Sequence, residues 1–262
     1  MAVTRHNILS DKRVRDGYVD GVLALKGEFL GTTTADLGIP GPPEDVSTYD
    51  LFTVWHHLAM MRMTPPTQGD RNSAHSGPVF LPWHRFMLLL LELQLQRVLG
   101  DREFGLPYWD WAADGDLPAD EQPLAPIWTE DGVGGNGAPV DGPFGPSRYR
   151  VRIDSGRGGT LRTTNRGLVR DLAGEPDFTT LPTSADVDDA LAQEVYDGPP
   201  WDRSTRHFRN RVEGWQPNGP RLHNRVHVCV GGVGGDMGPA TSPNDPVFYL
   251  NHCKQTACGR RG

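Results

Sequence analysis

The segment His75-Ser-Gly-Pro-Val-Phe-Leu-Pro-Trp-His84-Arg85 is the most informative part of this sequence for its fold. It joins a polar connector over residues 69–82 to a long apolar segment that ends near Leu99. Proline is favourable in the first turn of a helix, so we predict a helix from about Pro82 to Leu99. Residues 86–91 are apolar all round, which predicts that this helix lies centrally in the core.

Further helical signals lie on both sides of this stretch. Ser10-Asp11 can cap a helix with apolar residues every three or four positions, and a Ser/Thr cap opens a second helix from about Ser47 to Met61. Weaker candidates are residues 184–196, 222–230 and 246–253. Strand signal is sparse. We therefore predict a mainly α protein, with a helical bundle core wrapped in long Gly- and Pro-rich loops that include residues 30–46 and 115–159.

Composition bounds the possible classes of protein. The 262 residues fit one large domain or two small ones. With 26 Lys and Arg against 33 Asp and Glu, the net charge is −7, which argues against a nucleic-acid-binding protein. No apolar run approaches the ~20 residues of a membrane span. The 32 glycines and 23 prolines predict long loops between short regular elements.

The cysteines and the N-terminal residues indicate in which cellular compartment the protein is expected. Cys229, Cys253 and Cys258 form an odd cluster near one end of the sequence, which is not a disulfide framework. Residues 1–10 have no apolar signal core. We expect a cytoplasmic protein, or one exported together with a partner.

Histidine is the unusual component, because six of the nine fall into two groups of three. The first group is His56, His75 and His84, and the second is His223, His227 and His252. His57, beside His56, is a competing candidate. A lone histidine on a helix is usually structural, but several imidazoles buried together leave many nitrogens unpaired unless a metal binds them.

The residues around these histidines narrow the choice of metal. The segment His223-Asn-Arg-Val-His227 lacks the Glu of the His-Glu-x-x-His zinc proteases. No Glu-x-x-His pair typical of di-iron bundles is present either. Nitrogen ligands without thiolate or carboxylate favour copper. The residues themselves thus predict two metal ions, each with three imidazoles, and leave the reaction open.

Several segments resemble the type 3 copper proteins, namely tyrosinases, catechol oxidases, o-aminophenol oxidases and hemocyanins. The stretch 75–85 resembles their first copper signature. Two segments resemble the second copper signature, namely residues 223–227 with Gly231-Gly232, and Ser242-Pro-Asn-Asp-Pro-Val-Phe-Tyr-Leu-Asn-His252. Residues 106–111 and 208–215 also resemble bacterial tyrosinases. The resemblance runs from about Arg5 to Cys253.

The resemblance implies two copper ions, one held by His56, His75 and His84 and the other by His223, His227 and His252. His56 is preferred over His57 because it ends the family's Tyr-Asp-x-Phe-x-x-x-His run, which begins here at Tyr49. The implied enzyme uses O2 at a dicopper-peroxo centre to hydroxylate monophenols and to oxidise o-diphenols to o-quinones. A small copper-delivery helper protein is a further implied partner.

Three alternatives stay open at this point. The His56-His57 pair and residues 71–78 are similar to o-aminophenol oxidases of secondary metabolism. A hemocyanin-like O2 carrier is disfavoured, because carriers shield the dicopper site with extra domains. The third alternative is a copper-poor, inactive paralogue.

Two polar residues are implied to assist the chemistry. In bacterial tyrosinases, a Glu upstream of the second signature and an Asn after its first His hold a water that deprotonates the monophenol. Here these residues are Glu213 and Asn224. An ion pair between Glu213 and a nearby Arg is the structural alternative. Phe80 and Phe248, each four residues before a histidine, are expected either to pack on the ligand rings or to be ordinary core.

The C-terminal residues depart from the family pattern. The family continues with an Asp-Arg-x-Trp helix, whereas this chain reads His252-Cys-Lys-Gln-Thr-Ala-Cys-Gly-Arg-Arg-Gly262. We therefore expect residues 1–262 to be a single tyrosinase-like domain, truncated or frameshifted after about residue 253.

Overall fold

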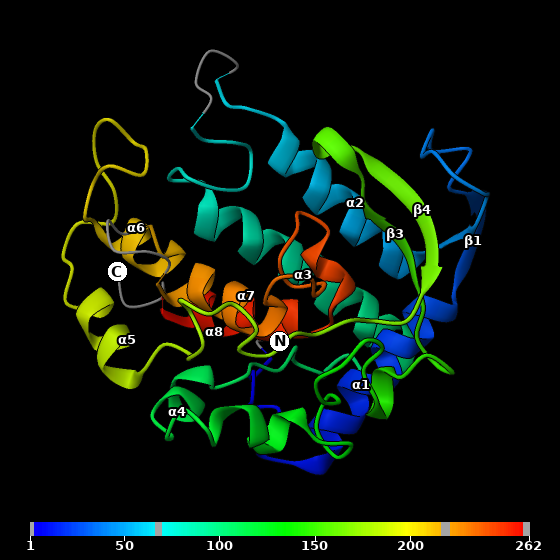
Figure 1. Cartoon of the computed structure of the whole chain (residues 1–262), viewed down its shortest axis with the longest axis horizontal. Coiled ribbons are helices and arrows are strands. Elements are labelled where there is room, and N and C mark those ends of the chain that lie inside the picture. Colours follow the sequence, from blue (N-terminus) through cyan, green and yellow to red (C-terminus); the bar gives the residue numbers. More distant parts are fainter. Residues whose placement is uncertain (1–2, 66–69, 216–220, 259–262) are drawn as a thin grey trace.

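The computed structural model, which describes residues 3–65, 70–215 and 221–258, has helices at its centre, α3 (Phe80–Leu99), α7 (Leu222–Gly231) and α8 (Val247–Cys258) among them (Figure 1). Helix α1 (Lys12–Gly27) packs against α2 (Thr48–Met61) and α3, and α3 packs against α8. The predicted mainly α architecture is confirmed. Within the described residues, no helix combines the length and apolar character needed to cross a membrane.

The first two helices begin where the sequence predicts. The side chain of Asp11 accepts the backbone N–H of Arg13 at the start of α1. Ser47 caps α2, and Ser47 and Asp50 form a reciprocal capping box that satisfies two backbone donors. These caps fix where each apolar stripe starts, and therefore which turn of α2 carries His56.

Helix α3 corrects one prediction. It begins at Phe80, two residues before Pro82, and ends at Leu99, where Gly100 with a left-handed φ of 66° caps it. The expectation that residues 86–91 are buried all round is wrong, because Phe86 is 54% and Leu89 44% exposed. Neighbouring helices cover only the face of α3 that carries Leu88 and Leu91, and one covered face is enough to anchor a helix.

The remaining helices are short. They are α4 (Trp111–Gly115), α5 (Ser184–Leu191), α6 (Phe208–Glu213) and α7 (Leu222–Gly231). Helix α5 ends five residues before the predicted boundary, and α8 continues five residues beyond its predicted end at residue 253. Residues 259–262 lie outside the described residues. The prediction of a truncated or frameshifted end stays a prediction.

Two antiparallel hairpins interrupt the segments predicted as loops. Strands β1 (Phe29–Thr33) and β2 (Asp45–Ser47) form one pair. Strands β3 (Val151–Ser155) and β4 (Leu161–Arg166) form the other, with Val151 opposite Arg166 and Ser155 opposite Leu161. Short 3-10 turns fill other loops, at Gln122–Leu124, Pro126–Trp128, Gly142–Phe144, Arg157–Gly159 and Ser242–Asn244. The β3–β4 hairpin lies beside α2 (Figure 1).

The turn before α8 is held by buried side chains from distant segments. The hydroxyl groups of Tyr18, Tyr49 and Tyr149 donate to the carbonyls of residues 246, 243 and 244, at 2.6, 2.9 and 2.6 Å. Asp245 accepts two hydrogen bonds from the Arg170 guanidinium, at 2.7 and 2.8 Å, and also caps α8 through the backbone N–H of Val247. These bonds fix the direction of α8.

Removing the Asp245 carboxylate tests how much this anchor contributes. We expect Asp245→Ala to lower the free energy of unfolding by about 3–5 kcal/mol, because it leaves the buried Arg170 charge unpaired. The control Asp16→Ala breaks only the pairs of the solvent-exposed Asp16 carboxylate with Lys12 and Arg15, and should change stability by no more than about 1 kcal/mol. Urea denaturation measures both. Equally small effects would contradict the anchoring role.

Candidate metal centre

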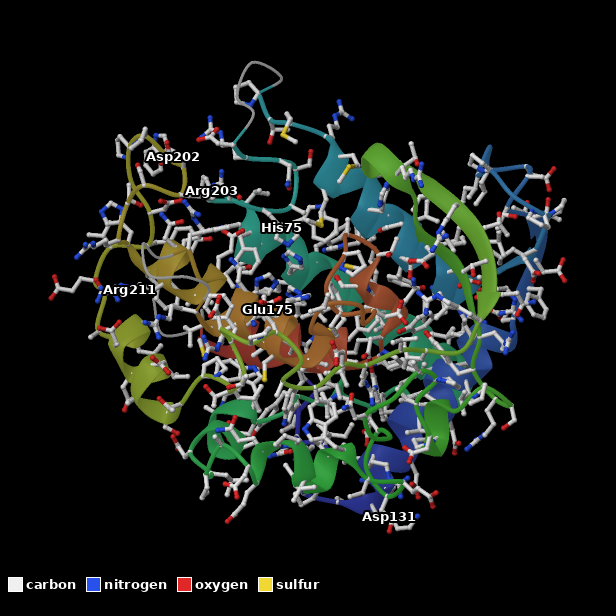
Figure 2. All side chains as sticks on the ribbon, viewed as in Figure 1. His75, Asp131, Glu175, Asp202, Arg203 and Arg211 are labelled. Carbon is white, nitrogen blue, oxygen red and sulfur yellow. The ribbon has the colours of Figure 1, made fainter. Side chains whose placement is uncertain are left out.

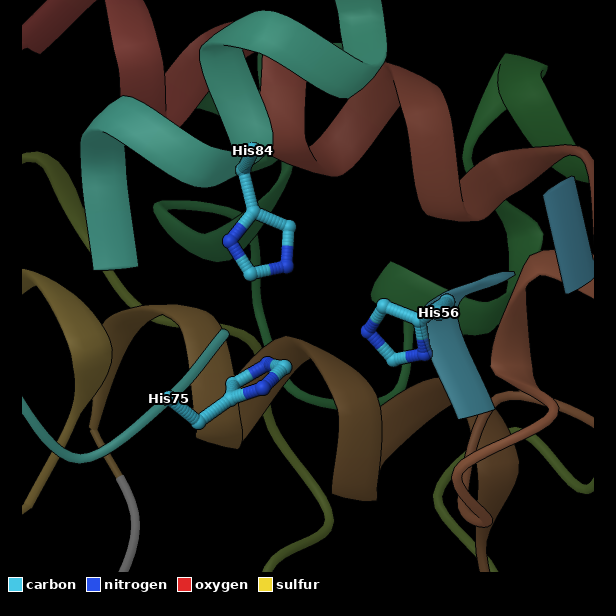
Figure 3. A group of neighbouring side chains, drawn as sticks. All are labelled: His56, His75 and His84. Atoms are coloured by element: carbon cyan, nitrogen blue, oxygen red, sulfur yellow. The ribbon is translucent and has the colours of Figure 1, made fainter. Parts of the chain in front are cut away.

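His56, His75 and His84 form the first histidine group, and their rings point into one common space (Figure 3). Helix α2 carries His56 and the first turns of α3 carry His84. His75 lies in the connector before α3, where Asn72 Oδ1 accepts its backbone N–H at 2.8 Å. One nitrogen from each ring lies within 4.8 Å of the other two. The group could hold one metal ion.

His223, His227 and His252 form the second group. The first two lie one turn apart on α7, so both rings project from the same helix face. His252 comes from the middle of α8, which packs against α7. Their candidate ligand nitrogens also lie within 4.8 Å of one another. This group could hold a second ion.

The two groups share one buried cluster. The rings of His84 and His252 stack at a centroid distance of 4.1 Å and an interplanar angle of 9°. His75 and His223, again one from each group, lie 5.7 Å apart between centroids. Two ions bound in these groups would therefore be neighbours.

Backbone carbonyls orient the rings. Nδ1 of His56 bonds the Ala240 carbonyl at 2.7 Å, and Nδ1 of His84 bonds the Phe80 carbonyl at 2.8 Å. Nδ1 of His227 bonds the Met237 carbonyl at 2.6 Å. A carbonyl only accepts, so each Nδ1 carries the proton and each Nε2 presents a lone pair. These three Nε2 atoms are buried and have no hydrogen-bond partner within the described chain.

Burial keeps these imidazoles neutral. Desolvation lowers the pKa of His56 to about 3 and that of His227 to about 4. It also lowers the pKa of the other four well below the usual value, with the nearby histidines adding to the effect. Neutral imidazole is the form that binds a metal.

The donor set fits copper. In the described part of the chain, both groups consist of histidine alone, without carboxylate or thiolate. Imidazole suits Cu, Zn, Fe and Ni, whereas Ca and Mg prefer oxygen ligands. The unpartnered Nε2 atoms are what a metal would satisfy, because a buried polar atom without a partner is costly.

His57 turns away from this cluster. Its Nε2 bonds the carbonyl of Gly159, at 3.1 Å, in the turn between β3 and β4. It belongs to neither group of candidate ligands. The hairpin beside α2 thus distinguishes the two adjacent histidines, which the sequence alone could only rank by resemblance.

Glu213 lies next to the first group and is fully buried. Its Oε1 accepts the backbone N–H of Ser76 at 2.6 Å, and its Oε2 accepts a bond from Arg209 at 3.1 Å. The ion pair between Glu213 and a nearby arginine, which was the structural alternative, is therefore present, and the arginine is Arg209. Burial raises the pKa of Glu213 to about 7, although Arg209 opposes that shift. Each oxygen retains a lone pair for a further donor.

Asn224 follows the first histidine of α7 and lines a cavity that histidines of both groups also line. Its Oδ1 accepts from Nδ1 of His223 at 2.8 Å, which leaves the amide N–H groups available to another acceptor. The backbone carbonyl of Glu213 also lies 3.3 Å from that Nδ1. The two predicted polar residues are therefore linked through His223.

Two phenylalanines pack on the histidine rings. Phe80 lies 4.8 Å from His84 and 4.9 Å from His223 between ring centroids. Phe248 lies 4.2 Å from His252 and 5.0 Å from His56. Both contact rings from both groups, so they limit the rotation of the rings and keep water away from them.

The histidine cluster forms the floor of a cavity of about 580 Å³. Histidines from both groups line it, together with Asn224 and Trp215. Two features of the cavity wall are not predicted from the sequence. Ser76, directly after His75, has a left-handed φ of 63°, and Arg71 and Arg203 both border the cavity. No local sequence signal brings residues 71 and 203 together.

The fold and the paired histidine groups define a type 3 copper protein, and comparison with known proteins agrees. The family model for the common central domain of tyrosinase matches residues 46–255. Tyrosinase from Streptomyces antibioticus is 40% identical over 209 residues, which cover 78% of this chain and 68% of that protein. Grixazone synthase from Streptomyces griseus is 37% identical over 237 residues, or 80% of this chain and 73% of that one.

Solved structures show the same fold. A polyphenol oxidase from Thermothelomyces thermophila superposes with a TM-score of 0.71 at 25% identity, covering 98% of this chain and 68% of that one. A functional unit of octopus hemocyanin superposes with a TM-score of 0.53 at 18% identity, covering 98% and 52%, which is a likeness of fold alone. The chain belongs to the tyrosinase family, and it is a phenol-oxidising enzyme of the type 3 copper class.

The lowered histidine pKa values predict an acid-sensitive metal-free protein. Stability should be fully present above the unfolded-state pKa of about 6.5 and should fall as the pH drops below it, because unfolding then takes up protons. For His56 and His227 the loss at pH 5 is about 2 kcal/mol each, from pKa values of about 3 and 4. Urea denaturation from pH 8 to pH 5 measures this. A pH-independent stability would contradict buried neutral imidazoles.

Proposed function

We propose that His56, His75 and His84 bind one copper ion, and that His223, His227 and His252 bind the other. The observation that carries this proposal is the buried cluster of neutral imidazoles, three of which (His56, His84 and His227) have Nε2 atoms without a partner within the described chain. The family is a dicopper family, and both groups contain the three nitrogen donors that this chemistry uses.

The proposed reactions are ortho-hydroxylation of monophenols and oxidation of o-diphenols to o-quinones, with O2 as oxidant. The copper pair, when bound, supplies O2 binding and the acceptance of electrons. The protein contributes the cavity, which has room for one phenol ring with a short side chain. Phe80 and Phe248 hold the rings at its floor, so the substrate hydroxyl meets ligands that are already in position.

Glu213 and Asn224 are proposed to hold a water molecule that takes the phenol proton. A phenol with a pKa of about 10 is a poor metal ligand until it is deprotonated. Glu213, with its pKa raised to about 7, is a stronger base than an ordinary carboxylate and is partly ionised at neutral pH. The free amide N–H groups of Asn224 can orient the same water, while its Oδ1 fixes His223.

Oxidation of o-aminophenols is the second candidate function. It is favoured by the similarity to grixazone synthase, which is 37% identical to this chain. The same cavity and the same histidine groups would serve both reactions. Parallel assays with tyrosine, catechol and an o-aminophenol distinguish them by the ratio of kcat/KM values.

Adjacent histidines on α2 test the ligand assignment. His56→Gln should reduce the bound copper from two ions per chain to about one, because a ring nitrogen of His56 lies within 4.8 Å of the candidate ligand atoms of the other two rings. His57→Gln is the matched control and should retain two, since His57 bonds only the Gly159 carbonyl. Copper analysis after reconstitution measures both. Two copper ions in His56→Gln, or fewer than two in His57→Gln, would overturn the ligand assignment. One copper ion or none in the unaltered protein would favour the copper-poor, inactive paralogue.

A copper-delivery helper protein is also proposed, because the ligand nitrogens lie buried at the floor of the cavity. Reconstitution with a copper salt alone tests this. If the metal-free protein took up two copper ions as fast as a small chelator binds copper, no helper would be needed.

Glu213→Gln tests the proton-accepting role. We expect it to lower monophenol hydroxylation about 100-fold while diphenol oxidation falls much less, since only the monophenol needs the base. Asp197→Asn is the control, because Asp197 pairs with the same Arg209 at 2.8 Å but lies outside the proposed water site. Initial rates on matched mono- and diphenols measure the ratio. An equal loss on both substrates, or the same ratio change in the control, would show a structural role only.

A further inference from the structure

We propose that an exposed apolar patch on α2 and α3 is a dimer interface, on which a second copy of this chain packs around a two-fold axis. The patch consists of uncharged side chains that are only partly buried or exposed, namely Leu51, Trp55, Leu58, Trp83, Phe86, Leu90 and Leu93. None of these residues lines the cavity at the histidine groups. The inference therefore does not depend on the proposed function.

Contacts between aromatic rings join the two helices into one surface. The ring centroid of Trp55 on α2 lies 5.0 Å from that of Trp83 and 6.1 Å from that of Phe86, both on α3. Leu51 and Leu58 lie about one turn to either side of Trp55, so they extend the same face of α2. The patch is therefore one continuous surface with aromatic rings at its centre.

The two helices run antiparallel, which aligns their apolar faces. In the last turn of α3, Arg97 donates to Glu28 at 2.8 and 2.5 Å, and Glu28 accepts the hydroxyl of Thr48 at 2.5 Å. Thr48 is the first residue of α2, so the end of α3 lies beside the start of α2. Leu90 and Leu93 lie between the aromatic contacts and this end. The patch therefore extends along both helices.

The size of the patch fits a homodimer. Leu58, Phe86 and Leu93 are 57, 54 and 48% exposed. With roughly 150–250 Å² for a large aromatic side chain, and less for a leucine, the exposed apolar area is on the order of 500 Å². Each partner in an interface of standard size buries about 800 Å², and about 65% of a homodimer interface is apolar. The patch and its polar rim match both values.

The charged residues of α2 and α3 do not interrupt the patch. Of the four, Asp50 and Glu92 are buried. Arg85 donates to a backbone carbonyl of α8 at 3.2 Å, and Arg97 is already paired with the carboxylate at the end of the patch. A second molecule can therefore cover this face without leaving a charge buried and unpaired.

The charge of the chain favours a second copy as the partner. In Figure 2, charged side chains such as Asp131, Asp202 and Arg211 lie at the edge of the molecule, away from α2 and α3. The net charge is −7, so two copies repel each other, and a neutral face is where they can meet. Every copy carries the same patch, and a two-fold axis places its aromatic centre against the equivalent centre of the partner.

Sedimentation velocity on the copper-reconstituted full chain tests the proposal. We expect a dimer at micromolar concentration. Phe86→Glu should weaken the dimer about 100-fold, because the two-fold axis brings the two new charges together. Leu124→Glu is the matched control and should leave the dimer intact, because Leu124 is 77% exposed in a turn outside the patch. A monomeric unaltered chain, which would leave the patch to another kind of partner, would overturn the proposal, as would a dimer in Phe86→Glu as tight as the unaltered one.

A charge-swap experiment separates a specific interface from a loss of folding. Phe86→Lys alone should also be monomeric, whereas an equal mixture of Phe86→Glu and Phe86→Lys should form a mixed dimer, at least about tenfold tighter than either variant alone. Circular dichroism checks that both variants fold. Leu58→Glu and Leu58→Lys, at a still more exposed position, repeat the experiment if they do not. No gain on mixing folded variants would overturn the two-fold arrangement.

Discussion

The packing of this protein has to accommodate six imidazoles buried together, and the Nε2 lone pairs of His56, His84 and His227 have no partner in the described chain. Burying a polar atom without a partner is costly, and burying a positive charge costs more. The protein meets both costs by keeping each ring neutral and aiming the free nitrogens at one place. Four helices supply five of the six rings, and the packing of α3 against α8 and of α7 against α8 brings the two groups face to face.

Loops complete what the helices begin. The carbonyls of Ala240 and Met237, both in the segment between α7 and α8, fix the tautomers of His56 and His227. The turn that follows is tied down by three buried tyrosines and by Arg170, so that α8 presents His252 in a fixed direction. The many glycines and prolines therefore contribute to the metal centre, because the turns that they form place carbonyl oxygens within hydrogen-bond distance of the histidine rings.

Much of this centre follows from sequence pattern because helical spacing is local. The i, i+4 spacing of His223 and His227 predicts one shared helix face, and the cap at Ser47 sets the start of α2. Contacts between distant segments were beyond prediction. The orientation of His57 depends on Gly159 in a hairpin that shows little strand signal, and the exposure of Phe86 depends on which face of α3 its neighbours cover. The pairing of Arg71 with the loop of Arg203 likewise exists only in the folded chain.

Anomalous diffraction at the copper edge, from crystals of the reconstituted protein, locates the copper ions. We expect two peaks, one inside each histidine group, each about 2 Å from the imidazole nitrogens that face it, as is usual for metal–imidazole bonds. The Nδ1 atoms of His56, His84 and His227 should keep their carbonyl partners. A single peak, a peak bonded to His57, or ligation through those Nδ1 atoms would contradict the proposed ligand sets.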